Sequence, residues 1–379
     1  MKNNTIGIIT IHKINNYGSV LQAYALQEVC HKLGYTVEII DYSFPNDFHN
    51  SKAPVFETDQ NPVLTNEPKW IKALFAKALL RQHKTIAKFV SSKLNLSAKS
   101  FSSPVELEKS CPAYDVYITG SDQLWSPRYC KGDPAFMLHF APESAKKISY
   151  AASIGTNVIP ENLKKQYKTL LGRYQSLSVR EKSGKEIVER LTGKDVSVVL
   201  DPTLLLNRNE WAAIIPEGTK RVKKKYILCY FLNYTFNAFP YVDNLARDIQ
   251  RQTGYEIVRV ARPPHHISIG KTEYRVGASP EEFLELVRGA EIVLTTSFHG
   301  TAFALNFGRP VFSIVQSHDT RDSRQVNILR LLGLDRQIIS ISDSYPDYRL
   351  ASYNVEKEQQ DLESLRKKSI EYLNRALEQ

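Results

Sequence analysis

Short runs of apolar residues alternate with longer amphipathic stretches along the first half of this 379-residue chain. The short runs have the length and composition of strands buried in a parallel sheet, and the longer stretches repeat apolar residues at the helical period. This alternation predicts an α/β domain with right-handed crossovers. The predicted strands are residues 6–11, 37–42, 114–119, 148–155, 176–181 and 196–200, and the predicted helices are 19–33, 70–94 and 161–173.

The second half repeats the alternation, which predicts a second α/β domain. Its strands are expected at residues 226–232, 256–260, 292–294 and 311–314, and its helices at 239–253, 280–288, 301–307 and 355–377. We therefore predict two Rossmann-like α/β domains that face a cleft. The first takes residues 1–205 with an insertion at about 44–110, the second takes residues 206–350, and a C-terminal helix in 351–379 packs back on the first.

The clearest candidate site follows the predicted strand 292–294, where Ser297-Phe298-His299-Gly300-Thr301 leads into a short helix. In open α/β sheets ligands bind beyond the carboxyl ends of the strands, and the N-terminus of a helix favours an anion. His299 is a candidate proton donor there, with Ser297, Gly300 and Thr301 beside a bound anion. A histidine hydrogen-bonded into a turn explains the pattern equally well.

Polar residues also follow strands of the first domain. Arg180 ends a strand and is a candidate for bidentate binding of a carboxylate or phosphate, or else a structural partner of Glu181 or Asp201. Ser121 and Asp122 follow strand 114–119, and Asp122 either accepts hydroxyl protons from a sugar or caps a helix.

Further polar and aromatic residues are considered on weaker grounds. Asn16 and Tyr17 lie in the first predicted loop and are candidates for binding an acceptor, although Asn-Tyr-Gly is also common turn chemistry. Trp125 either stacks on a sugar or fills the core, and Asp201 is interpreted as structural. Arg321 and Arg324 follow the strand 311–314, and either could reach an anion or form a surface ion pair.

Composition limits the alternatives. The net charge of +10 admits anionic partners, but the excess is diffuse and lacks interleaved aromatics, so we expect no nucleic-acid partner. The four cysteines are far apart, and we expect neither a metal site nor a disulfide framework. Neither a signal peptide nor a run of about eighteen apolar residues is found, which predicts a cytoplasmic protein. The usual dinucleotide and P-loop motifs are missing.

In order along the chain, several segments resemble the bacterial polysaccharide pyruvyl transferases. They are residues 7–10, 16–27, 120–125, 178–181, 201–203 and 297–301. The resemblance implies a GT-B-like pair of domains and transfer of a pyruvyl group from phosphoenolpyruvate to two hydroxyls of a sugar, which forms a cyclic ketal and releases phosphate. Such an enzyme would act in capsule or exopolysaccharide synthesis without a cofactor.

The same resemblance places His299 and Arg180 at the donor site. Some members have Arg-Leu-His where this chain has Ser-Phe-His, so a further arginine contact to the donor must come from elsewhere, with Arg321 and Arg324 as candidates. Asp122 or the Asn16-Tyr17 loop would orient the acceptor. The likeness also implies a sugar acceptor on a polyprenyl diphosphate lipid and, with the positive charge, peripheral contact with the inner membrane face.

Two rival functions stay open from the sequence. One is a GT-B glycosyltransferase that uses a nucleotide sugar, because a fold does not determine a function. The other is a non-catalytic protein that binds a sugar or an anion. The acceptor sugar, the stereochemistry of the ketal and the oligomeric state are not specified by any motif.

Overall fold

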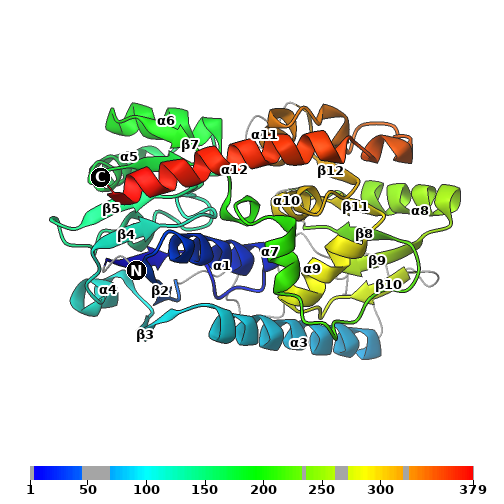
Figure 1. The fold of residues 1–379 in the computed structure, drawn as a ribbon, viewed down its shortest axis with the longest axis horizontal. Coiled ribbons are helices and arrows are strands. Elements are labelled where there is room, and N and C mark those ends of the chain that lie inside the picture. Colours follow the sequence, from blue (N-terminus) through cyan, green and yellow to red (C-terminus); the bar gives the residue numbers. More distant parts are fainter. Residues whose placement is uncertain (1–3, 45–68, 233–235, 261–271, 319–323, 379) are drawn as a thin grey trace. The chain divides into compact units, whose positions relative to one another are not determined.

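The computed structural model describes residues 4–44, 69–232, 236–260, 272–318 and 324–378. These residues form two compact units, which are described in turn (Figure 1). The first unit takes in the described residues of Met1–Asn50, Lys88–Leu206 and Glu363–Gln379, and the second those of Ser51–Ala87 and Asn207–Leu362. Two long helices, α3 (Lys69–Lys93) and α12 (Val355–Glu378), each contribute residues to both units.

The first unit is built on a parallel sheet with the strand order β3-β2-β1-β4-β5. Isolated parallel bridges join β5 to the pair β6-β7 and so extend the sheet. The strands are β1 (Thr5–Ile9), β2 (Thr36–Tyr42), β3 (Leu96–Phe101), β4 (Val116–Thr119), β5 (Lys146–Ser149), β6 (Leu177–Val179) and β7 (Val196–Val198). The helices are α1 (Tyr17–Lys32), α4 (Pro104–Ser110), α5 (Glu161–Leu171) and α6 (Lys182–Thr192), with short 3₁₀ turns at Pro134–Met137 and Pro202–Leu204.

The second unit has the parallel strand order β10-β9-β8-β11-β12-β13. Its strands are β8 (Tyr226–Tyr230), β9 (Glu256–Val260), β10 (Thr272–Arg275), β11 (Ile292–Thr295), β12 (Val311–Val315) and β13 (Ile338–Ser340). Its helices are α7 (Arg208–Ala213), α8 (Tyr241–Thr253), α9 (Pro280–Gly289), α10 (Phe298–Asn306) and α11 (Arg324–Leu331), and 3₁₀ turns lie at Asp335–Gln337 and Tyr348–Ala351.

Both sheets share one topological feature. In the first unit β1 pairs with β2 on one side and with β4 on the other, and in the second β8 lies between β9 and β11 in the same way. The chain therefore winds outward in opposite directions from β1 and from β8. This reversal is the switch point at which open α/β sheets bind their ligands, beyond the carboxyl ends of the two central strands.

The central strands form where they do because nearly all their residues are buried, as in β4 and β8, where every residue is buried, whereas the edge strands β3 and β10 are more exposed. A strand covered on both faces requires a continuous apolar run, which is the pattern that predicted them. The predictions erred at the ends of elements. The strands expected at 148–155 and 176–181 are only β5 and β6, because Ala151 with a φ of 54° turns the chain beyond β5 and Glu181 is the N-cap of helix α6 after β6. The helix expected at 301–307 begins at Phe298.

Several elements were missed, including β3, α4, α6, α7, β10, α11 and β13. Of the predicted insertion at about 44–110, residues 45–68 lie outside the described residues. Within the described chain, no helix combines the length and the apolar composition that crossing a membrane requires.

Candidate functional site

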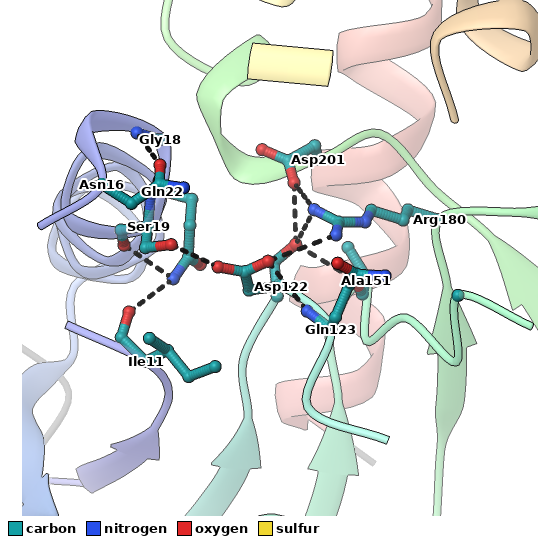
Figure 2. Close-up of polar contacts among 12 residues, drawn as sticks. Ile11, Asn16, Gly18, Ser19, Gln22, Asp122, Gln123, Ala151, Arg180 and Asp201 are labelled. Carbon is teal, nitrogen blue, oxygen red and sulfur yellow. Dashed lines mark hydrogen bonds and ion pairs between the residues drawn. The ribbon is translucent and has the colours of Figure 1, made fainter. Parts of the chain in front are cut away.

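Four buried polar residues follow neighbouring strands of the first unit and bond to one another. Ser121 and Asp122 follow β4, Arg180 follows β6, and Asp201 lies beyond β7. Their bonds join residues as far as 80 positions apart in the chain. Because all these strands are parallel, their carboxyl ends meet at one edge of the sheet, and the four residues form one polar network there. Figure 2 shows Asp122, Arg180 and Asp201 in this network.

Arg180 is the cation of this network, and its side chain is only 1% exposed. Its Nη1 donates to Oδ2 of Asp201 at 2.7 Å, and its Nη2 lies 3.4 Å from Oδ1 of Asp122. Burial lowers the pKa of the guanidinium, but Asp201, Asp122 and Glu181 raise it by more, so the net shift is upward. Arg180 is thus held as a buried cation by carboxylates of its own unit, and the ion pair with Asp201 that the structural alternative named is present.

Asp122 joins this cation to helix α1. Its Oδ2 accepts a hydrogen bond from Oγ of Ser19 at 2.6 Å, and its Oδ1 accepts one from the backbone N–H of Gln123 at 2.8 Å. Its backbone has a φ of 84°, which Asp adopts at lower cost than most non-glycine residues. The conformation turns the chain just beyond β4 and places the carboxylate between Ser19 and Arg180 (Figure 2).

Gln22 and Thr10 continue the network toward β1. Nε2 of the fully buried Gln22 lies 2.8 Å from Oγ1 of Thr10 and 2.9 Å from the carbonyl oxygen of Ser19. Among the described residues three buried side-chain oxygens near the network have no hydrogen bond, namely Oε1 of Gln22, Oγ of Ser153 and Oε2 of Glu181. Ser153 donates its backbone N–H to the carbonyl oxygen of Asp122. An unpaired buried polar atom is costly, and hydroxyls of a ligand are suitable partners for such atoms.

The network carries more negative than positive charge. One guanidinium lies within 4.0 Å of three carboxylates, those of Asp122, Asp201 and Glu181. Glu181 in turn accepts hydrogen bonds from the backbone N–H groups of Ile154 and Gly155. Carboxylates accept hydrogen bonds from hydroxyls and repel anions. The arrangement therefore favours a neutral, hydroxyl-bearing ligand over an anion at this edge of the sheet.

A second charged group lies on the β2 side of the same edge. His12 is fully buried, with Nδ1 3.0 Å from the carbonyl oxygen of Thr10 and Nε2 3.1 Å from Oδ1 of Asp41. Both partners can accept a hydrogen bond, and the tautomer of the ring decides which nitrogen donates. Lys13 lies 2.5 Å from Asp41. Burial raises the pKa of Asp41, but hydrogen bonds from His12, Lys13 and Ser100 lower it by more, and the net shift is strongly downward.

In the second unit, the predicted histidine motif forms the first turn of α10, at the switch point. Ser297 is the N-cap, and its Oγ accepts from the backbone N–H of Gly300 at 3.4 Å. Gly300 is required by close packing, since a Cβ there would lie 2.3 Å from Oγ1 of Thr295. Thr301 bonds to Oγ of Ser313 on β12 at 2.8 Å. His299, 6% exposed, is held in this turn, so the motif is a packed helix start rather than a loop before a helix.

Aromatic contacts connect this turn with α11. The rings of Phe298 and His299 lie 5.1 Å apart in an edge arrangement. The guanidinium of Arg324, at the start of α11, lies 5.7 Å from the centroid of the Phe298 ring. A cation over an aromatic ring is held by the quadrupole of the ring. The structure thus brings Arg324 next to the histidine motif, whereas Arg321 lies outside the described residues.

The remaining candidates have structural contacts. Asn16 is the N-cap of α1, where its Oδ1 accepts hydrogen bonds from the backbone N–H groups of Gly18 and Ser19. The alternative that the Asn-Tyr-Gly sequence serves a turn therefore accounts for Asn16. The prediction that Tyr17 lies in a loop is wrong, because Tyr17 is the first residue of α1 and is 1% exposed. Trp125 is fully buried and donates a hydrogen bond from Nε1 to the carbonyl oxygen of Phe136. These contacts agree with the alternative in which Trp125 fills the core.

Sequence reasoning missed Ser19, Gln22, His12 and Asp41 as members of this edge. A signal for two of them exists, because α1 is buried along most of its length and yet places Ser19 and Gln22 three residues apart among apolar neighbours. Polar residues on a buried helix require partners. Among the described residues, no group of three His, Cys, Asp or Glu side chains is arranged to hold a metal ion. The assignments of individual residues to catalysis and binding stay predictions.

Two solved structures share the architecture. One is the UDP-GlcNAc 2-epimerase from Methanocaldococcus jannaschii, 12% identical, with a TM-score of 0.50 over 95% of this chain and 91% of that chain. The other is the S. aureus MnaA–UDP co-structure, 11% identical, with a TM-score of 0.52 over 96% of this chain and 88% of that chain. At this identity they show the fold alone. The chain is an α/β protein of two Rossmann-like domains in the GT-B-like class, as predicted.

The family is narrower than this class. The family model described as "Polysaccharide pyruvyl transferase" matches residues 16–318, which include the network of the first unit from Asn16 to Asp201 and the histidine motif of the second. The chain belongs to the polysaccharide pyruvyl transferase family, and it is a transferase of polysaccharide biosynthesis. The resemblance seen in the sequence is thereby confirmed. A comparison with curated proteins finds no match.

Proposed function

We propose that this enzyme transfers a pyruvyl group from phosphoenolpyruvate to two hydroxyls of one sugar, which forms a cyclic ketal and releases phosphate. The family match over residues 16–318 carries the proposal. Two features of the sites support it. At one switch point lies a network with net negative charge that can accept hydrogen bonds from hydroxyls. At the other lies a buried histidine at a helix N-terminus.

The two protons that the sugar hydroxyls lose balance the protons that the reaction consumes. A proton is added to the methylene carbon of phosphoenolpyruvate through the electron pair of the double bond, which leaves positive charge at C2. The first sugar hydroxyl forms a C–O bond to C2 and loses its proton. The second hydroxyl then displaces phosphate by forming the second C–O bond. One hydroxyl proton replaces the one given to the methyl group, and the other leaves with the phosphate.

We assign His299 as the donor of the proton to the methylene carbon, because imidazole is the side chain best suited to proton transfer near neutral pH. The first turn of α10 supplies backbone N–H groups suited to the phosphate or carboxylate, and Arg324 is close enough to the motif to add positive charge. On the acceptor side we assign Asp122, with Ser19 bonded to it, to orient the sugar hydroxyls.

Arg180 has a different role in this proposal from the donor contact that the family resemblance implies. Its guanidinium bonds to Asp201 and lies close to Asp122, and it is nearly inaccessible. We assign it to hold the Asp122 carboxylate in place and ionised, so it acts as a positioning residue. The acceptor is proposed to be a sugar carried on a polyprenyl diphosphate lipid, where a growing saccharide is available to a cytoplasmic enzyme.

The test combines the wild-type enzyme with phosphoenolpyruvate and a panel of lipid-linked or free saccharides. Ketal formation is followed by mass spectrometry and by the methyl signal in NMR spectra, and phosphate release is measured in parallel. Ketal and phosphate in equal amounts support the proposal. Phosphate release without a ketal on any sugar contradicts it.

The role of His299 is tested by His299→Ala, which we expect to lower turnover by about a hundredfold or more because the proton donor is removed. His318→Ala is the matched control, since His318 lies in the same unit, its side chain is 48% exposed, and among the described residues it bonds to Asp343 alone. The control should keep turnover within about twofold. Turnover of the His299 variant close to that of the control would refute the assignment.

Ligand-dependent stability separates this function from transfer of a sugar from a nucleotide. A ligand that binds only the folded state raises the melting temperature. We expect phosphoenolpyruvate to raise it more than inorganic phosphate does. The S. aureus MnaA–UDP co-structure makes a UDP-sugar the appropriate comparison, and stabilisation by the UDP-sugar alone would favour a glycosyltransferase.

A further inference from the structure

The long helix α3 has an unusual charge composition. Its 25 residues include seven Lys or Arg and no Asp or Glu. The other long helix, α12, carries both signs in nearly equal number, with six acids and five bases in 24 residues. Length therefore does not explain the composition of α3. A basic helix without acids is typical of elements that bind a polyanionic surface.

The side chains of α3 are divided between two faces over the part where they are described. One face, with Gln82, Ile86, Phe89 and Val90, is buried. The opposite face consists of the exposed residues Lys77, Leu80, Arg81, Lys84 and Lys88, here called the α3 stripe. Spacings of three and four residues place them on one side of the helix, which Figure 1 shows as one continuous element.

The stripe combines uncompensated charge with an exposed apolar residue. Among the described residues, Arg81 pairs with Glu282 at 2.9 Å, while Lys77, Lys84 and Lys88 have no ion-pair partner. Leu80, in the middle of the stripe, is 61% exposed. The basic run at residues 220–225 differs, because three of its cations pair with glutamates. These pairs are Arg221–Glu285, Lys224–Glu256 and Lys225–Glu291.

We propose that the α3 stripe docks the enzyme on the surface of an anionic lipid bilayer, with the lysines at the headgroups and Leu80 inserted between them. The charge of the stripe complements anionic lipids, and an apolar side chain between lysines suits an interface in which lysine stems lie along apolar surface. A nucleic acid fits less well, because the described stripe has no aromatic side chain on which a base could stack. The proposal is independent of the reaction, since docking requires neither donor nor acceptor.

The test is sedimentation of the full-length protein with vesicles. Wild type is mixed with phosphatidylcholine vesicles that contain phosphatidylglycerol and with vesicles of phosphatidylcholine alone. We expect binding to the anionic vesicles only, weakened by added salt. The triple variant K77Q/K84Q/K88Q should lower the partition coefficient by about a hundredfold, at roughly fivefold for each charge removed. Leu80→Gln, which keeps all charges, should lower it by about tenfold.

The matched control is K220Q/K223Q/K225Q, which removes three exposed lysines from the other basic run. It has the same net charge as the stripe variant. If vesicle binding depended only on net charge, both variants would therefore bind the vesicles equally weakly. Wild-type-like binding by the control and loss in the stripe variant support the proposal. Equal loss in both variants, no binding of wild type to anionic vesicles, or stripe-dependent binding to RNA but not to vesicles would each overturn it. Circular dichroism verifies that each variant is folded.

Discussion

Removal of Arg180 should destabilise the first unit strongly. The substitution Arg180→Met keeps the apolar stem and removes the guanidinium, which leaves the 1%-exposed Asp201 and the nearby Asp122 without a cation. Breaking a buried ion pair by removing one partner costs about 3–5 kcal/mol. For a domain of this size that corresponds to a fall in melting temperature of about 6–20 °C.

The cost should depend on pH in a defined direction. Without the cation, the ionised form of the Asp201 carboxyl loses its ion pair in the folded state. The loss of stability is therefore greatest where this carboxyl is ionised, and it decreases as the carboxyl becomes protonated. The deficit of Arg180→Met should therefore be largest near pH 8 and should shrink toward pH 4.

Urea unfolding followed by tryptophan fluorescence measures this deficit. The chain has three tryptophans, and substituting Trp70 and Trp211 by Phe leaves Trp125 as a reporter buried in the first unit. Arg251→Met is the control, because that side chain is 76% exposed and an exposed ion pair contributes less than about 1 kcal/mol.

The pairing itself is tested by adding Asp201→Asn to Arg180→Met. Neutralising the carboxylate should recover part of the stability, with a coupling energy of about 1–3 kcal/mol in the double-mutant cycle. A loss below about 1 kcal/mol for Arg180→Met at pH 8, or a deficit that grows on acidification, would refute the view that Arg180 compensates buried carboxylates.

Two further predictions concern packing and charge. Gly300→Ala should cost about 1–3 kcal/mol, because the added Cβ would lie 2.3 Å from Oγ1 of Thr295, whereas Gly218→Ala, with no atom within 4 Å of its Cβ, should be neutral in the same urea assay. Asp41→Asn should cost about 3 kcal/mol at neutral pH. Since the folded pKa of Asp41 is lowered, its contribution is present above pH ~4 and disappears below it, and a gap that widened in acid would contradict this.

The order of residues determined the class of the fold and the places where function was sought. Continuous apolar runs such as 226–232 require burial on both faces, so they predicted parallel strands, and the helical period between them predicted the crossovers. Both depend on neighbours within a few residues, which is why they can be seen in one dimension. The same local reasoning found the polar groups that follow strands, including Ser121, Arg180 and His299, and the family resemblance came from their order.

What the sequence could not determine was which of these groups meet. Ser19 bonds to Asp122 from 103 positions away, and Arg180 bonds to Asp201 from 21 positions away, because β1, β4, β6 and β7 end at one edge of the sheet. Strand order is set by crossovers and not by local periodicity. The sharing of α3 and α12 between two units likewise follows from long-range packing. The physical reason is that an ion pair or a hydrogen bond depends on distance in space, and only the tertiary structure sets that distance.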